Sequence, residues 1–193
     1  MIPGMAPGEL AEADRHAQEL IDEGRFAQAV GVLDDVIDPA PAALGSESAQ
    51  VVELFLLRAT ALALSDDAAR ARPEFTALAD VLERQAGRDD ERALLCHQQA
   101  AYCLAQLGET TRALHAAEEV LTRIRAVGGE RSDDALDLRQ AIAMWRLRSG
   151  DTGQAARELH ALYADLRAQY GPQAPEALQV AEMLDRLRGR GTP

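Results

Sequence analysis

The sequence predicts an all-α protein built from repeated helical hairpins, on the evidence of three observations. Glycine recurs every 42 residues, at Gly45, Gly87, Gly129 and Gly171. Within each interval apolar residues recur at spacings of three and four, which is the period of an amphipathic helix. Alanine contributes 38 of the 193 residues and aromatic residues only 4 %. That composition suits closely packed helices better than a β-sandwich.

Small residues follow the same 42-residue register. Two columns consist of alanine throughout: Ala17, Ala59, Ala101 and Ala143, and then Ala29, Ala71, Ala113 and Ala155. Each interval predicts two helices, and the small alanines of the first column are expected to let the paired helix approach closely. A bulky side chain at such a position would overpack the pair.

A third column marks the turn between the two helices of each hairpin. It holds Gly24, Gly108 and Gly150, with Asp66 as its second member. Glycine can adopt the left-handed conformation that ends a helix. Asp66, Glu109 and Asp151 are expected near the start of the following helix, where a carboxylate meets free N–H groups.

The pattern predicts one solenoid domain over residues 8–189, between a disordered N-terminus (1–7) and a frayed tail (190–193). Its repeats span about 8–44, 45–86, 87–128 and 129–170, followed by a capping helix within 171–189. Helices are expected over 8–23, 25–38, 47–65, 67–86, 89–107, 109–127, 132–149, 151–170 and 174–189, with the segment 39–46 as the loosest joint. The capping helix should cover the end of the stack with Leu178, Ala181, Leu184 and Leu187, and turn Arg186, Arg188 and Arg190 to water.

Charge excludes two classes of partner. The chain has 32 acidic and 20 basic residues, and every basic residue is arginine. Nucleic acids and anionic membranes both require a basic face, so neither is expected as a partner. No apolar run reaches the roughly 18 residues of a membrane span, and the N-terminus lacks the features of a signal peptide. A cytoplasmic protein with reduced cysteines is expected.

The residues give little support for an enzyme. Cys96, His97 and Cys103 could suggest a nucleophile or a metal site. However, both cysteines fall on the buried side of one helix, too far apart for a disulfide, and three ligands on one helix match no zinc spacing. His16, His115 and His160 lie in different columns. We therefore expect no catalytic residues, metal or cofactor, and keep a cysteine-dependent enzyme as the alternative from another class.

The hairpins resemble tetratricopeptide repeats (TPRs), which carry Ala-x-x-x-Phe/Leu in the second helix. The 42-residue length and the joint Gly171-Pro172-Gln173-Ala174-Pro175-Glu176-Ala177-Leu178 resemble the longer repeats of the kinesin-light-chain type. The segment from Gln99 to Thr110 is similar to repeats of actinobacterial proteins, including regions appended to Ser/Thr protein kinases. The resemblance implies a right-handed superhelical solenoid of about four hairpins plus the capping helix.

The resemblance also implies a function: a non-catalytic scaffold or adaptor that binds a peptide or partner helix on its concave face, in actinobacterial signalling. In TPR arrays the first helix of each repeat lines that face. By column, the candidate contacts are Leu56, Thr60, Gln98, Tyr102, Gln106, Gln140, Met144, Leu147 and Arg148. Trp145 falls in a column that packs between helices. No lysine is available for the carboxylate clamp of some TPR domains.

Two further binding roles remain open at this point. One is self-association into a homodimer through the first-repeat end, for which the sequence offers no covering helix. The other is a regulatory C-terminal region of a Ser/Thr kinase. The acidic N-terminal part, with ten acidic residues and two arginines among residues 1–50, predicts a basic, salt-sensitive partner contact.

Overall fold

The computed structural model describes residues 7–37 and 48–190. In this part of the chain the regular structure is entirely α-helical, as predicted. Packing divides the chain into two compact units, Met1–Glu109 and Thr110–Pro193. The division falls between the two helices of the third predicted repeat.

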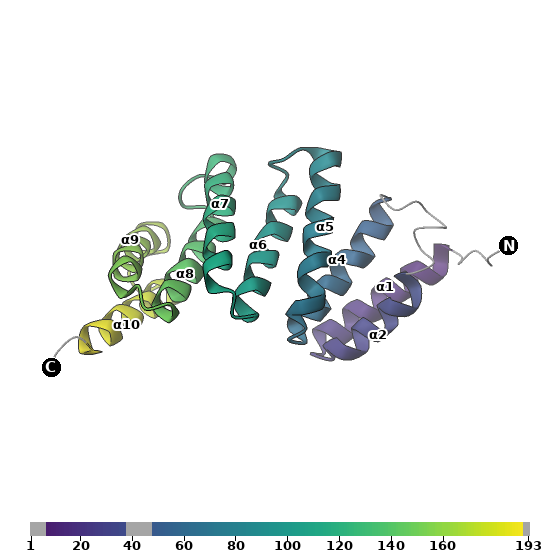
Figure 1. The fold of residues 1–193 in the computed structure, drawn as a ribbon, viewed down its shortest axis with the longest axis horizontal. Coiled ribbons are helices and arrows are strands. Elements are labelled where there is room, and N and C mark those ends of the chain that lie inside the picture. The colour runs from purple at the N-terminus through teal and green to yellow at the C-terminus, as the bar shows by residue number, and fades with distance from the viewer. Residues whose placement is uncertain (1–6, 38–47, 191–193) are drawn as a thin grey trace. The chain divides into compact units, whose positions relative to one another are not determined.

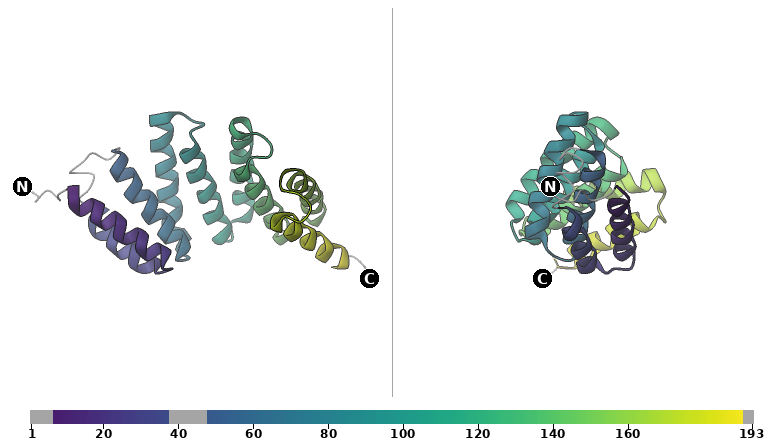
Figure 2. Two further views of the ribbon diagram at one scale, coloured as in Figure 1. Left: turned by 180° about the vertical axis from the view of Figure 1, so that it is seen from behind. Right: turned by 90° about the vertical axis from the view of Figure 1, so that its right-hand side faces the viewer.

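The described residues of unit 1 form five helices, coloured purple to teal in Figure 1. They are α1 (Pro7–Asp22), α2 (Phe26–Ile37), α4 (Ala49–Leu64), α5 (Ala68–Ala86) and α6 (Glu91–Gln106). Each packs against the next along the chain, and α1 also reaches α4. Figure 2 shows α1 and α2 side by side from behind.

In unit 2, residues 110–190 form four helices, coloured green to yellow in Figure 1. They are α7 (Thr110–Gly128), α8 (Asp133–Arg148), α9 (Thr152–Tyr170) and α10 (Pro175–Arg190). Again, each helix packs against its successor. All nine predicted helices are confirmed, with ends within two residues of those expected.

The two alanine columns lie in the buried interior. All eight alanines of the two columns have an exposed fraction of 0 %. Larger residues fill the space between them, for example Leu33, Phe75 and Leu159 of one further column, which are 0–1 % exposed. The buried interior therefore combines small alanines with larger branched or aromatic side chains.

The turn column has the expected left-handed backbone. Gly24, Gly108 and Gly150 have φ of 73°, 80° and 89°. Asp66 has φ of 62° and is the one non-glycine residue with positive φ in the part of the chain that the structure describes. It is therefore not the residue that caps the next helix, as the sequence had suggested: the Asp67 side chain accepts a hydrogen bond from the Arg70 N–H at 3.2 Å. Asp151 caps α9 as expected, accepting from the Gln154 N–H.

Four predictions need correction or fall outside the described residues: those on the two chain ends, on the joint 39–46 and on the buried face of α10. Arg190, expected in the frayed tail, ends α10, and Pro7 begins α1. The rest of both predicted ends, and the joint 39–46, lie outside the described residues. In α10, Leu184 is buried as expected, but Leu178 is 44 % exposed. Ala177 and Val180, both 0 % exposed, complete the buried face instead.

Exchanging the turn residues tests the backbone conformation. A non-glycine L residue in the left-handed region destabilises the folded state by about 1–2 kcal/mol. Glycine removes that strain, but it also makes the unfolded chain more flexible, which offsets part of the gain in stability. We expect Asp66→Gly to raise the free energy of unfolding by about 0.5–1 kcal/mol. Gly24→Asp, the reverse exchange in the same unit, should lower it by a similar amount. Urea denaturation followed by circular dichroism measures both; destabilisation by Asp66→Gly would contradict the assignment.

Candidate protein-binding surfaces

The candidate contacts in unit 1 lie on α4 and α6 and differ in accessibility. Gln106 is exposed, while Leu56 and Tyr102 are half-buried. The Thr60 hydroxyl donates to the Leu56 carbonyl at 2.8 Å, so it is already used within its own helix. Gln98 is buried, with 7 % exposed, and offers a partner almost no surface. Leu56, Tyr102 and Gln106 are the accessible members of the predicted set in this unit.

The candidate contacts in unit 2 form one stripe along α8. Gln140, Met144 and Leu147 are spaced four and three residues apart, so they share a helix face, and all three are half-buried. Arg148 follows at the end of α8 and is exposed. It makes no hydrogen bond or ion pair with the residues that the structure describes. This stripe combines flexible apolar side chains with an unneutralised cation, which is a composition found in protein contacts.

An arginine that sequence reasoning did not single out links three helices of unit 1. The Arg58 guanidinium of α4 lies 3.1 Å from the Asp34 carboxylate of α2 and 2.9 Å from that of Glu74 in α5. It also stacks over the Phe55 ring, 5.1 Å from the centroid. Burial raises the Glu74 pKa, and the Arg58 hydrogen bond and charge oppose that rise. Phe55 and Glu74 line a small, mainly apolar pocket of about 310 Å³ between α4 and α5.

Two buried arginines of α8 have the corresponding role in unit 2. Arg139 is 5 % exposed, and its Nη1 donates to Asp165 of α9 at 2.8 Å. Arg146 is 9 % exposed, and its Nη2 donates to Glu118 of α7 at 2.6 Å. Its other terminal nitrogen lies 3.3 Å from Glu158 of α9. In the 42-residue register Arg146 follows Leu20, Leu62 and Leu104, and this departure from leucine is a signal by which the buried ion pair could have been found.

The cysteines are core residues, as expected. Cys96 and Cys103 are 0 % and 1 % exposed, and both are free thiols. Burial raises the pKa of Cys96 to about 11, despite the opposing charge of Arg92. Burial also raises the Cys103 pKa. His97 lies 2.9 Å from the Glu83 carboxylate, so its outer ring nitrogen already has a partner on α5.

The remaining histidines and the tryptophan considered in the sequence analysis also have ordinary structural positions. His16, His115 and His160 are exposed, and Trp145 is buried at 6 % as its column indicated. Within the described residues, no three His, Cys, Asp or Glu side chains come together as a metal site. None of the described helices is long and apolar enough to cross a membrane.

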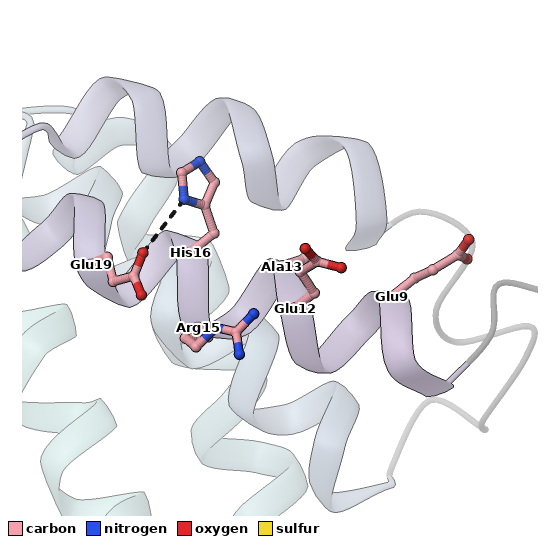
Figure 3. A pocket seen from close by; sticks show the side chains of 6 residues that line it. All are labelled: Glu9, Glu12, Ala13, Arg15, His16 and Glu19. Carbon is pink, nitrogen blue, oxygen red and sulfur yellow. Dashed lines mark ion pairs between the residues drawn. The ribbon is translucent and has the colours of Figure 1, made fainter.

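The exposed side of α1 is an open, charged surface rather than an apolar one. Figure 3 shows Glu9, Glu12, Arg15, His16 and Glu19 projecting from this helix around Ala13. His16 Nδ1 lies 3.9 Å from the Glu19 carboxylate. Such a charged stripe is typical of a helix face that is exposed to water.

Charge is divided unequally between the units. Residues 1–109 hold 20 of the acidic side chains and 8 arginines, whereas residues 110–193 hold 12 of each. The entire net charge of −12 therefore belongs to unit 1.

Comparison with solved structures identifies the fold. A Podosopora anserina protein of nearly identical TPR-like repeats, described as a kinesin light chain, superposes with a TM-score of 0.80 at 18 % identity, covering 97 % of this chain and 90 % of that one. A second structure of that protein gives 0.79 at 17 % identity, covering 96 % and 90 %. BtubC (BKLC) from P. vanneervenii gives 0.60 at 14 % identity, covering 92 % and 79 %.

These matches show that the chain has a TPR-like repeat fold of the kinesin-light-chain type. No family model matches the sequence, and no curated protein matches it either. At identities below 20 % the likeness extends to the fold alone.

The buried ion pair of α9 should make stability depend on pH in a defined direction. Burial by itself would raise the Asp165 pKa, but hydrogen bonds and charges from Arg139 and Arg131 outweigh it, so the pKa is lowered. A carboxylate whose pKa is lowered by folding stabilises the folded state fully at pH values above about 3.9, which is its pKa in the unfolded chain. That stabilisation is lost as the pH falls through the pKa of the folded state.

Asp165→Asn should therefore lower the free energy of unfolding by about 2 kcal/mol at pH 7, since Arg139 loses its carboxylate. The difference from wild type should shrink below about pH 4. Urea titrations at pH 7 and pH 3 provide the test. Glu182→Gln, which removes an exposed carboxylate of the same unit, is the control and should be nearly neutral at both pH values. An unchanged difference at pH 3 would contradict the assigned pair.

Cysteine burial predicts slow alkylation. At pH 8 both thiols are protonated and covered, so iodoacetamide should label the native protein only as it unfolds, and should label both cysteines rapidly in urea. Mass spectrometry over time gives the two rates. Rapid labelling of either cysteine in the native protein would contradict this prediction and favour the alternative hypothesis of a cysteine-dependent enzyme.

Proposed function

We propose that the protein is a non-catalytic scaffold or adaptor that binds a peptide segment or helix of a partner protein. The observation that carries this proposal is the α8 stripe, where Met144 and Leu147 lie beside the unpaired cation Arg148 on the first helix of a TPR-like hairpin. TPR-like hairpins are a fold used widely for protein interactions, which supports the proposal by analogy of fold. On α6, Tyr102 and Gln106 provide the corresponding surface of unit 1.

The proposed setting follows from the sequence resemblance. We place the protein in the cytoplasm, in actinobacterial signalling, either as an adaptor or as a regulatory C-terminal region of a Ser/Thr kinase. Buried, protonated thiols suit a reducing compartment. The acidic excess of unit 1 favours a partner with basic residues at that end of the contact.

Self-association is the second candidate. A symmetric dimer through the outer side of α1 would bring Glu9, Glu12 and Glu19 of two copies together, so like charges disfavour that interface. Light scattering across a concentration series separates a monomer from a dimer.

The proposal is tested by pull-down from native cell lysate with two groove variants. Tyr102→Ala changes unit 1, and Met144→Ala/Arg148→Ala changes unit 2. Arg186→Ala removes an exposed arginine of α10 outside the stripe and serves as the matched control. We expect a partner retained by wild type and by the control, and lost from at least one groove variant. Circular dichroism establishes that each variant is folded.

Salt should weaken capture if the acidic side of unit 1 contributes. Raising NaCl from about 0.05 M to 0.5 M shortens the Debye length several-fold and should reduce the retained partner. A partner held equally by wild type and both groove variants would refute the assigned face.

A further inference from the structure

The apolar pocket of about 310 Å³ between α4 and α5 of unit 1 is open to water. Within it, Val52 and Leu78 are buried, whereas Pro73 and Ala77 are exposed. A group from outside the chain can therefore reach buried apolar surface here. The described residues that line the pocket are Val52, Phe55, Pro73, Glu74, Ala77, Leu78 and Val81.

The repeat shows why a pocket forms at this place. Two repeats later in the 42-residue register, Phe55 and Val81 correspond to Arg139 and Asp165 of unit 2. There the Arg139 side chain is 5 % exposed, and its Nη1 donates to Asp165 at 2.8 Å, which joins the two helices of the hairpin. In unit 1 the same two positions hold apolar side chains, and both line the pocket. The pocket thus replaces a buried ion pair.

The stripe of α5 along the pocket is also apolar. Pro73, Ala77 and Val81 are spaced four residues apart, so they share one face of the helix. The corresponding stripes of the later second helices are mainly polar. They hold His115, Glu119 and Arg123 in α7, and Arg157, Ala161 and Asp165 in α9. Apolar residues at an outward stripe that is otherwise polar point to a contact surface.

The pocket offers little to a polar group. Among the described residues that line it, only Glu74 has a polar side chain. Both Glu74 carboxylate oxygens already face the Arg58 guanidinium, 3.1 Å from Nε and 2.9 Å from Nη2. A polar group that entered the pocket would lose water without gaining a partner. The side chain that fits is aliphatic, as in leucine or isoleucine.

The surroundings of the pocket favour positive charge on either side of that residue. Unit 1 holds 20 acidic side chains and 8 arginines, so its field attracts a basic segment. Arg58, the cation beside the pocket, is already paired with Asp34 and Glu74. Asp80 directly precedes Val81 and is exposed. It makes no hydrogen bond or ion pair with the residues that the structure describes, so its carboxylate is available to a lysine or arginine of a partner.

We propose that this pocket binds an aliphatic side chain of a partner protein that has lysine or arginine on both sides of it. The inference rests on the proposed scaffold function and specifies the chemistry of the contact with unit 1: a basic segment with a leucine or isoleucine anchor. The pocket is formed by both helices of a hairpin, whereas the candidate contacts named from the sequence all lie on first helices.

Three peptides separate the anchor from the charge. They are acetyl-Lys-Arg-Leu-Arg-Lys-amide, the same peptide with alanine in place of leucine, and acetyl-Glu-Asp-Leu-Asp-Glu-amide. In NMR titrations of the full chain at about 0.05 M NaCl, the basic leucine peptide should shift the methyl signals of Val52, Leu78 and Val81 with a Kd on the order of millimolar. The alanine peptide should bind about tenfold more weakly because it leaves the pocket unfilled. The acidic peptide should bind at least about fivefold more weakly.

Paired variants locate the binding. Ala77→Trp fills the pocket from an exposed position and should weaken the basic leucine peptide by about tenfold or more, while Thr76→Trp adds the same ring on another face of α5 and should leave binding unchanged. Asp80→Lys should weaken this peptide by about threefold or more, and Glu12→Lys, the same change in net charge on α1, should leave the Kd within about twofold. Thermal melts establish that the variants are folded.

Three results would overturn the proposal. Equal binding of the leucine and alanine peptides would remove the anchor, and equal binding of the basic and acidic leucine peptides would remove the charge. Unchanged binding of the basic leucine peptide by Ala77→Trp would remove the site. If 3-methylbutanol bound as tightly as this peptide, the occupant would be a small apolar molecule instead. Concentration-dependent dimers that Ala77→Trp dissociates would identify a second copy as the occupant and equally overturn the assignment.

Pull-down then separates this inference from the proposed function. A partner that Ala77→Trp loses, Thr76→Trp retains and the basic leucine peptide displaces supports both. A partner lost by Met144→Ala/Arg148→Ala yet retained by Ala77→Trp would overturn the pocket as its site and leave the scaffold function standing.

Discussion

The burial of small alanine side chains between neighbouring helices is the constraint on which the rest of this structure depends. Eight alanines in two columns have no exposed surface. A methyl group at each contact lets the helix backbones come near each other, which maximises dispersion contacts along the hairpin. Any larger side chain must then lie beside the contact. This sorting determines which helix faces are filled by leucine and which remain for other roles.

Alanine-rich contacts alone define the relative positions of helices weakly, because small side chains interlock little. Each unit adds a buried or half-buried ion-pair cluster across several helices. Arg58 joins α2, α4 and α5 through Asp34 and Glu74. Arg146 joins α7, α8 and α9 through Glu118 and Glu158. Such directional pairs favour one register over shifted ones, even where their net contribution to stability is small.

The same repeat positions thus have different roles in successive helices. In α8, Trp145 and Arg146 are buried, and Glu118 of α7 and Glu158 of α9 neutralise the Arg146 charge. In α10, Leu187 and Arg188 take those positions, where Leu187 is half-buried and Arg188 is exposed. Equivalent positions of the repeat can therefore be buried in one hairpin and partly exposed in another.

The sequence by itself determined the features that depend on local interactions. Periodicity located all nine helices, the glycine column located the left-handed turns, and column membership predicted the burial of Trp145, Cys96 and Cys103. Tertiary structure alone decided which polar side chains would be enclosed. Arg139 and Arg146 are buried because facing helices place carboxylates against them, while Gln98 is buried and Leu178 exposed against expectation. Burial depends on what a neighbouring helix presents at that point, and helical periodicity carries no information about the neighbour.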